Sequence, residues 1–314
     1  MEPLRIGLVG WGTVGSALGQ LVERGPLPVR LAWVAVREPR RERGVPLPEG
    51  VPVAGEPGPL DEIDALVELA GSVTEPRRWA TETLARGLAY VTANKALLAE
   101  HGAELAELAT LHDGALLASA SVGGGTPMLE VAEHLAASGR VARMRGLLNA
   151  TTTFILSAMA EGRSYRDALA EAQAAGYAEA DPSFDVEGRD AAQKLAILAW
   201  AAWGRWRPES DVARQGIVDV VVPAGVAVRL VAEATADRLT VGPISLDPED
   251  ILAGAAGVEC VLEIESEGAG SVVVRGPGAG GTATAGAVYA DLARLARGER
   301  PVIGQPPVAR PIHA

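Results

Sequence analysis

The sequence predicts an α/β fold, in which an N-terminal Rossmann-type domain with a doubly wound parallel sheet is followed by an α+β domain. Residues 4–125 alternate short apolar runs with helical segments, which is typical of a parallel sheet flanked by helices. The first apolar run leads directly into a glycine-rich turn. After about residue 128 the pattern changes to strand-like segments separated by several helices, which favours an α+β arrangement with a more open sheet.

The length and composition agree with two domains. A chain of 314 residues with 48% hydrophobic content is long enough for two packed cores. We place the N-terminal domain at residues 1–128 and the second domain at 129–280. Residues 282–297 again have a helical pattern, so we expect 281–314 to return to the first domain and complete it.

The elements of the first domain follow from its apolar pattern. We expect buried strands at residues 4–9, 31–36, 65–69, 89–92 and 116–118. Amphipathic helices are expected between them, at 14–24, 75–86 and 97–112. Residues 37–59 are rich in Pro, Gly and charge, which predicts an irregular excursion on the surface.

The second domain has longer spacings between its elements. Strands are expected at residues 142–148, 226–232, 258–263 and 271–274. Helices are expected at about 154–161, 165–175 and 188–203.

Charge and cysteine content exclude several classes of partner. The net charge is −12 and the longest basic cluster is 40–43, so the field of the protein repels nucleic acid and anionic membranes. The single cysteine, Cys260, cannot form an internal disulfide, and the N-terminus lacks the pattern of a signal peptide. No apolar stretch reaches the roughly 20 residues of a membrane-spanning helix. We therefore expect a cytoplasmic protein that acts on a small molecule, with neither nucleic acid nor membrane as a partner.

The glycine-rich turn predicts a dinucleotide site, because it follows a buried strand and precedes a helix. Its first glycine allows the tight turn, the second lets the backbone approach a pyrophosphate, and the third lets helix and strand pack closely. The pyrophosphate would lie at the N-terminus of the helix. A purely structural glycine turn is the alternative. The predicted cofactor-binding residues of this turn are Gly10, Gly12, Thr13, Val14 and Gly15.

The end of the second strand indicates which nicotinamide cofactor binds. An acid there would bond the ribose 2′-hydroxyl of NAD(H), whereas an arginine would bind the 2′-phosphate of NADP(H). Arg37 comes first and favours NADP(H); NAD(H) is the alternative, because Glu38 follows and can serve a ribose. Arg40 and Arg41 come next, and they also fit a solvated loop.

The two lysines are candidate catalytic residues, because the other 26 of the 28 basic residues are arginines. A lysine can release its proton when its surroundings lower its pKa, whereas a guanidinium stays charged. Lys95 follows a buried strand, where side chains face the ligand crevice of a parallel sheet. Lys194 ends an acidic segment and shares a helix face with Asp190, four residues before it. Chance retention of two lysines and a surface salt bridge are the alternatives.

Six segments carry a resemblance to one enzyme family. They are 10–15 (GWGTVG), 91–98 (VTANKALL), 120–127 (ASVGGGTP), 148–156 (LNATTTFIL), 176–194 (GYAEADPSFDVEGRDAAQK) and 276–285 (GPGAGGTATA). In these segments, and over essentially its whole length, the chain resembles the homoserine dehydrogenases. The acidic segment 176–194 is the most specific of the six.

The resemblance implies the reaction and the assembly. The family interconverts L-aspartate 4-semialdehyde and L-homoserine with NAD(P)(H) in threonine and methionine biosynthesis. It pairs a Rossmann domain with a catalytic domain that dimerises, so we expect a homodimer. Many members carry a further regulatory ACT domain, which we do not expect in this chain.

The resemblance also implies residue roles. Lys194 is the expected proton donor, Lys95 lies at the reacting group and the cofactor, and Asp190 orients the donor or holds the substrate amine. Hydride transfer turns the aldehyde oxygen into an alkoxide, which a lysine ammonium can stabilise and protonate. Lys95 would add positive field and lower the pKa of its neighbour by repulsion. The further expected substrate contacts are Glu179, Asp185, Asn149, Thr151 and Tyr177, and the further cofactor contacts are Gly176 and Gly280.

The chain departs from the family pattern at two positions. Ser119 stands where the family usually has a glutamate that binds a monovalent cation. A Na⁺ or K⁺ ion would then be held only by backbone carbonyls of Val122, Gly124 and Thr126. Ala150 stands at a usual glycine of the substrate loop, which restricts the backbone and bears on substrate choice. Two other functions remain as alternatives: a related amino-acid dehydrogenase such as an aspartate dehydrogenase, and a nonenzymatic NAD(P)-binding sensor.

Overall fold

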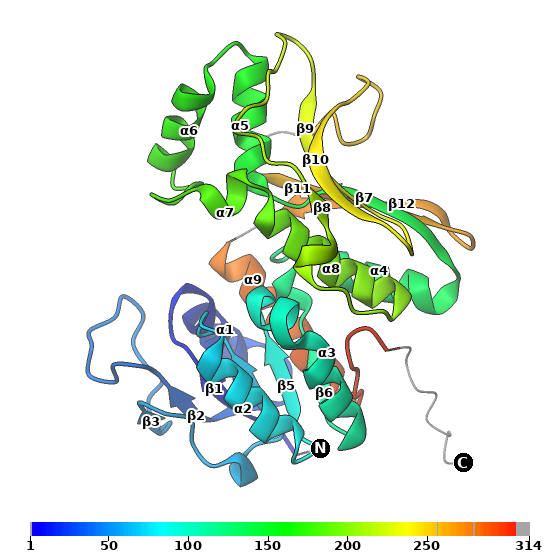
Figure 1. The fold of residues 1–314 in the computed structure, drawn as a ribbon. Coiled ribbons are helices and arrows are strands. Elements are labelled where there is room, and N and C mark those ends of the chain that lie inside the picture. The colour runs from blue at the N-terminus through cyan, green and yellow to red at the C-terminus, as the bar shows by residue number, and fades with distance from the viewer. Residues whose placement is uncertain (1, 256, 279, 306–314) are drawn as a thin grey trace. The chain divides into compact units, whose positions relative to one another are not determined.

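The structure is a computed structural model that describes residues 2–255, 257–278 and 280–305 (Figure 1). The chain divides into two compact units, Met1–Ser121 with Gly280–Ala314, and Val122–Ala279. The sequence predicts these divisions at 128/129 and 280/281; of the predicted returning segment, residues 306–314 lie outside the described residues. Each unit contains a sheet of its own.

The first unit contains a six-stranded parallel sheet, which confirms the predicted fold class. Its strands lie in the order β3-β2-β1-β4-β5-β6. The chain therefore moves outward on one side of β1, returns to β4 and moves outward on the other side. The carboxyl ends of β1 and β4 form the switch point, where ligands bind in sheets of this kind. The strands are β1 (Leu4–Val9), β2 (Val29–Ala35), β3 (Val53–Ala54), β4 (Ala65–Glu68), β5 (Ala89–Thr92) and β6 (Ala115–Leu117).

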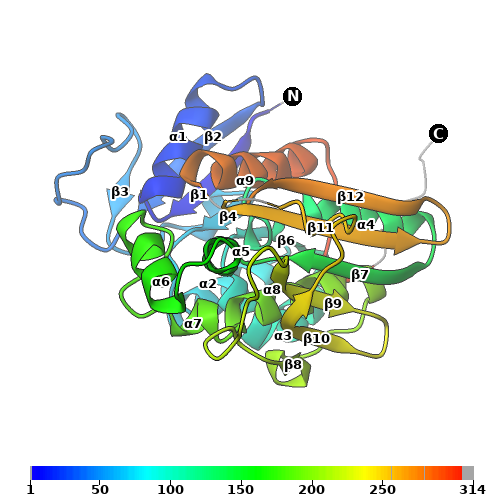
Figure 2. The ribbon, with the colours of Figure 1, turned by 90° about the horizontal axis from the view of Figure 1, so that it is seen from above.

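The helices of the first unit include one from the far end of the chain. In Figures 1 and 2 the orange helix α9 lies beside the blue helix α1. The apolar face of α9 is buried in the same core as β1, through Ala285, Val288 and Leu292. The helices are α1 (Thr13–Arg24), α2 (Thr74–Leu84), α3 (Lys95–Leu111) and α9 (Gly281–Ala296), with the short 3₁₀ turns η1 (Leu60–Glu62) and η2 (Ser119–Ser121).

The second unit contains a mixed sheet with strands in the order β12-β11-β7-β9-β10-β8, which Figure 2 shows side by side. All neighbours are antiparallel except β8 and β10. The strands are β7 (Val141–Leu147), β8 (Ala213–Arg214), β9 (Val228–Ala234), β10 (Leu239–Ser245), β11 (Glu259–Ser266) and β12 (Gly270–Pro277). The helices are α4 (Met128–Ser138), α5 (Ala150–Ala160), α6 (Tyr165–Ala174), α7 (Ser183–Val186) and α8 (Arg189–Trp203), with the turn η3 (Glu209–Asp211).

Several elements differ from the prediction. The sequence pattern does not predict α4, α7, β8 or β10, and β3 lies inside the segment expected to be irregular. Strand β10 contains Gly242 and Pro243, which argue against a strand. They are tolerated because β8 pairs only with Thr240 and Val241, so Pro243 needs no hydrogen-bond partner on that side. Within the described part of the chain, none of the helices combines the length and apolar character that a membrane crossing needs.

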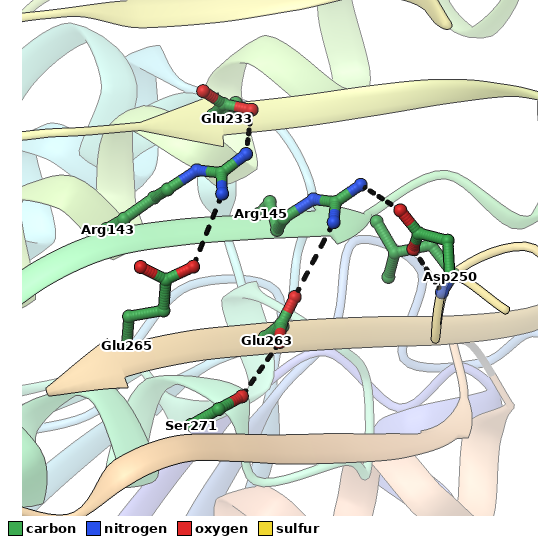
Figure 3. A network of polar contacts seen from close by, with 8 residues as sticks. Arg143, Arg145, Glu233, Asp250, Glu263, Glu265 and Ser271 are labelled. Carbon is green, nitrogen blue, oxygen red and sulfur yellow. Dashed lines mark hydrogen bonds and ion pairs between the residues drawn. The ribbon is translucent and has the colours of Figure 1, made fainter. Parts of the chain in front are cut away.

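One face of the second sheet carries a network of ion pairs, shown in Figure 3. Arg143 and Arg145 project from β7, and the acids that bind them come mainly from the neighbouring strands β9 and β11. Arg143 binds Glu233 at 2.8 Å and Glu265 at 3.3 Å. These cross-strand pairs explain how a central strand accommodates two arginines. Arg145 binds Asp250 at 2.7 Å and Glu263 at 3.7 Å, and Ser271 of β12 donates to Glu263 at 2.8 Å.

Candidate functional site

The predicted site residues fall into two clusters, one in each unit. The cluster of the first unit contains the glycine loop, Arg37, Lys95 and Gly280. The second unit contains Asn149, Thr151, Gly176, Tyr177, Glu179, Asp185, Asp190 and Lys194, of which Asn149, Asp185, Asp190 and Lys194 lie together.

The glycine loop has the geometry of a phosphate cradle. Gly10 adopts a φ of +101°, which disfavours any other residue, and a Cβ there would lie 2.7 Å from the Leu69 carbonyl oxygen. A Cβ on Gly15 would lie 2.1 Å from the carbonyl oxygen of Gly10. Around Gly12, in contrast, no atom lies within 4 Å of such a Cβ. Two glycines are therefore required by the turn itself, and the third borders open space that a pyrophosphate fits.

Two helix N-termini meet at this loop. Helix α1 begins at Thr13 and α9 begins at Gly281, and a Cβ on Gly281 would lie only 2.3 Å from the Thr13 methyl carbon. Neither helix has a side-chain cap, because Gly12 and Gly280 occupy the capping positions. The amide groups of both first turns are thus available to an anion, which the positive ends of the helix dipoles also favour.

Arg37 lies two residues after the end of β2 and its side chain is exposed. The chain then turns back, and Arg43 closes this turn by donating to the carbonyl oxygens of Glu38 and Arg41, both at 2.6 Å. Arg41 lies 4.0 Å from Glu38. Of these arginines, Arg37 is the one placed at the carboxyl end of the second strand, where the 2′-phosphate is recognised.

Glu68 is a buried acid at the switch point that the sequence analysis did not single out. It ends β4 and is fully buried. Its Oε1 accepts a hydrogen bond from the N–H of Ala70 at 2.6 Å, and its Oε2 accepts one from the Thr92 hydroxyl at 2.8 Å. Burial raises the pKa of Glu68, although these hydrogen bonds oppose the shift. The only sequence signal is an acid at the end of an apolar strand.

Glu68 connects two loops at the carboxyl edge of the sheet. Thr92 in turn accepts a hydrogen bond from the N–H of Asn94 at 2.9 Å, and the Asn94 amide donates to the carbonyl of Ser72 in the loop after β4. Asn94 caps α3 by accepting from the N–H of Leu97 at 3.1 Å. Lys95 is the first residue of that helix and is half-buried. The position of Lys95 is therefore determined by a chain of contacts that begins at Glu68.

Lys194 lies in a compact polar cluster of the second unit. Its Nζ donates to Asp190 Oδ2 and to the carbonyl oxygen of Leu148, each at 2.8 Å. Asn149 donates through its amide to Asp185 at 2.7 Å and to Asp190 at 2.9 Å. The Asn149 side-chain oxygen caps α5 by accepting from the N–H of Thr152 at 2.8 Å. Three separate segments thus bring two carboxylates, one amide and one ammonium group together.

The charge of Lys194 is stabilised by this cluster. Burial by itself lowers the pKa of a lysine, but the carboxylate of Asp190, with Cys260 and Asp185, raises the pKa of Lys194 above the ordinary value of 10.5. Burial raises the pKa of the Cys260 thiol. Lys194 is consequently protonated throughout the neutral range, which a proton donor requires.

The other predicted residues surround α5 and the loop after α6. Thr151 donates to the Tyr177 carbonyl at 2.6 Å, and the ring of Tyr177, which is 43% exposed, contacts Phe154 with centroids 5.3 Å apart. Gly176 adopts a φ of +75°, which favours glycine. Glu179 is exposed and, within the described residues, takes no part in the Lys194 cluster. Its predicted contact with substrate stays a prediction.

The predicted cation ligands are partly engaged elsewhere. Val122 is buried, and Gly123 and Gly124 both have positive φ angles. The carbonyl of Thr126 accepts a hydrogen bond from the N–H of Met128 at 2.7 Å. Within the described residues, no group of three or more His, Cys, Asp or Glu side chains is arranged to hold a metal ion.

Ser119 has a partner of its own in the first unit. Its hydroxyl donates to Asp291 at 2.6 Å and its N–H donates to the other oxygen of that carboxylate at 3.1 Å. Both residues are buried. Ser119 therefore joins the turn η2 to helix α9.

Two family models match the chain. A homoserine dehydrogenase model matches residues 127–293, and a model of the homoserine dehydrogenase NAD-binding domain matches residues 10–118. The homoserine dehydrogenase of Mycobacterium tuberculosis is 36% identical over 94% of this chain and 73% of its own length.

Solved structures agree with the sequence matches. A homoserine dehydrogenase from Thiobacillus denitrificans superimposes with a TM-score of 0.87 at 31% identity, over 95% of this chain and 74% of that one. A hyperthermophilic archaeal homoserine dehydrogenase in complex with NADPH superimposes with a TM-score of 0.81 at 28% identity, over 96% and 99% of the two chains.

Proposed function

The chain belongs to the homoserine dehydrogenase family of NAD(P)-dependent oxidoreductases that act on a CH–OH group, and we propose how its residues carry out the interconversion of L-aspartate 4-semialdehyde and L-homoserine. The observation that carries the proposal is the polar cluster of Lys194, Asp190, Asp185 and Asn149, in which Asp190 and Asn149 are buried and the other two are half-buried. A single amine in contact with carboxylates and a nearby amide fits a site that binds a zwitterion and moves one proton.

We propose Lys194 as the proton donor and acceptor. The bound cofactor supplies the hydride that reaches the aldehyde carbon, and the carbonyl oxygen then needs a proton. The Lys194 ammonium donates that proton and is left as a neutral amine, which takes a proton from solvent before the next turnover. In the opposite direction the neutral amine removes the hydroxyl proton of homoserine. Asp190 is the positioning residue, because it holds Nζ at 2.8 Å.

We propose that acids and amides of the same unit hold the ends of the substrate. Asp185 and Glu179 bind its ammonium group, and Tyr177 borders the site. Asn149 and Thr151 receive its carboxylate, for which one of the two hydrogen bonds from Asn149 to the acids would have to open. Both signs of charge are required in one site because the substrate is a zwitterion.

We propose NADP(H) as the preferred cofactor, with NAD(H) as the alternative. The open space at Gly12 and the uncapped starts of α1 and α9 suit a pyrophosphate. Arg37 would bind the 2′-phosphate as a charge-assisted hydrogen bond. Lys95, Gly176 and Gly280 would complete the cofactor contacts.

The assembly and the cation are finer proposals. We propose a homodimer formed through the second unit, which sedimentation analysis would test. Exposed Ile244 of β10 and Val273 of β12 are apolar positions on this unit's sheet that a second copy would cover. We propose that a monovalent cation is bound weakly, because Ser119 is engaged by Asp291 and the remaining ligands are neutral carbonyls.

A spectrophotometric assay tests the proposed reaction. The purified protein should oxidise NADPH when L-aspartate 4-semialdehyde is added, and should reduce NADP⁺ with L-homoserine. Activity with oxaloacetate and ammonium instead would identify an aspartate dehydrogenase. Binding of NADPH without turnover of any of these substrates would identify a sensor.

A further inference from the structure

Trp11 lies in the glycine loop, but its side chain contacts a different segment. The indole is buried, and its Nε1 donates to the carbonyl oxygens of Val45 at 3.2 Å and Pro46 at 3.1 Å. Its ring covers Gly19 of α1 so closely that a Cβ on Gly19 would lie 2.2 Å from it. Trp11 is thus held between the helix that follows the glycine loop and the excursion after β2.

The part of the excursion between β2 and β3, residues 37–52, has few other attachments. Arg43 makes hydrogen bonds within it, and Pro52 accepts one from Val34 at its end. Leu47 and Val51 pack partly against the core. Among the described residues, every hydrogen bond that joins 38–51 to the rest of the unit comes from Trp11. A segment of this length has many conformations to lose, so this attachment restricts it substantially.

We propose that Trp11 is a positioning residue for cofactor selectivity, which holds the excursion against the glycine loop so that Arg37 at its start is placed for a 2′-phosphate. The inference rests on the proposed binding of NADP(H). Affinity gained by preorganising Arg37 applies to the 2′-phosphate and not to the rest of the dinucleotide. A tryptophan that only fills the core would contribute to stability without distinguishing NADPH from NADH.

Trp11→Phe tests the proposal, with Trp33→Phe as the matched control. Phe keeps an aromatic ring over Gly19 and removes both hydrogen bonds. Trp33 is also buried, but its Nε1 donates to the carbonyl oxygen of Pro59 at 3.2 Å and not to Val45 or Pro46. Dissociation constants for NADPH and NADH are measured by nicotinamide fluorescence. We expect Trp11→Phe to weaken the binding of NADPH about tenfold and that of NADH by less than about threefold. Trp33→Phe should change the ratio of the two dissociation constants little.

Limited trypsin digestion gives a readout that needs no cofactor. Cleavage at Arg40, Arg41 and Arg43 should accelerate in Trp11→Phe and not in Trp33→Phe, because the excursion is released only in the first variant. Leu47→Ala loosens the same excursion without changing a residue of the glycine loop, and should reproduce both effects if Trp11→Phe does not fold.

The outcomes separate the inference from the proposed function. An equal loss of affinity for NADPH and NADH in Trp11→Phe would overturn the role of Trp11. An unchanged rate of trypsin cleavage in both Trp11→Phe and Leu47→Ala would do the same. A wild-type protein that binds neither cofactor, or that prefers NADH, would instead refute the proposed cofactor itself. Faster cleavage together with selective loss of NADPH supports the inference.

Discussion

The buried pair of Lys194 and Asp190 should show strong energetic coupling in unfolding experiments. The two side chains are 14% and 6% exposed, with Nζ and Oδ2 2.8 Å apart, so solvent screens them weakly. Removing one partner leaves the other charge buried without compensation, which costs about 3–5 kcal/mol. Removing both charges avoids this penalty. The variants Lys194→Met and Asp190→Asn and the double variant therefore form an informative cycle.

The surroundings determine which single variant loses more stability. Lys194→Met leaves two carboxylates, Asp185 and Asp190, bound to one amide of Asn149. The free energy of unfolding should therefore fall by about 5 kcal/mol in this variant. Asp190→Asn leaves the ammonium group of Lys194 close to Asp185, so the free energy of unfolding should fall by only about 3 kcal/mol. The double variant should lose at least about 1.5 kcal/mol less than the sum of the two losses.

Denaturant unfolding of the four proteins measures this coupling, with Glu187→Gln as a control from the exposed part of the same segment. Because the folded state raises the pKa of Lys194, its stabilising contribution is present below the unfolded value of about 10.5 and is lost as pH rises through the folded pKa. The coupling should therefore be the same at about pH 7 and pH 9. Losses that add within about 0.5 kcal/mol would show that the pair does not act as a unit.

Three further predictions concern the cofactor and the cation. Arg37→Ala should weaken NADPH binding selectively, by about 1.5–3 kcal/mol, and equal loss of NADH in a fluorescence titration would mean that Arg37 serves the fold. Glu68→Ala should weaken the binding of both cofactors alike and lower the free energy of unfolding by at least about 2 kcal/mol, since the Thr92 hydroxyl and the Ala70 N–H lose their acceptor. Glu68→Gln should recover part of the cofactor affinity and part of the stability. Exchange of Na⁺ or K⁺ for a bulky organic cation at constant ionic strength should change turnover little, because Ser119 supplies no charge to a cation. If turnover instead collapses and recovers when Na⁺ or K⁺ is added, the backbone carbonyls are sufficient to bind the cation.

The parallel sheet is the part of the fold that the sequence predicts best. Strands β1 and β5 have the predicted bounds, because all four residues of β5 and the last four of β1 are buried and mostly apolar, as in a parallel strand covered on both faces. The pattern fails for β10, where Gly242 and Pro243 are tolerated only because the next strand is two residues long. Because this tolerance depends on the length of the neighbouring strand, it cannot be predicted from the sequence around β10.

In the candidate site, too, the sequence predicts continuous motifs but not contacts between residues that are far apart in the chain. The glycine loop and the acidic segment are continuous in sequence, so their residue types and spacing are sufficient to identify them. Asn149 meets Asp185 and Asp190 from across a gap of 36 and 41 residues, so its contact with both acids is visible only in the structure. Glu68 depends likewise on Thr92, 24 residues later. The sequence therefore identifies Asn149 and the acids as residues but not their contacts, and it misses Glu68 altogether.

Turnover of the two lysine-to-arginine variants tests the assignment of the proton donor most directly. Lys194→Arg keeps the charge but removes the transferable proton, so reduction of L-aspartate 4-semialdehyde should fall about 100-fold or more while NADPH still binds. Lys95→Arg makes the same chemical change at a residue proposed to supply positive field, and should lose less. If Lys194→Arg retains more than about a tenth of wild-type turnover at neutral pH, Lys194 is not the proton donor.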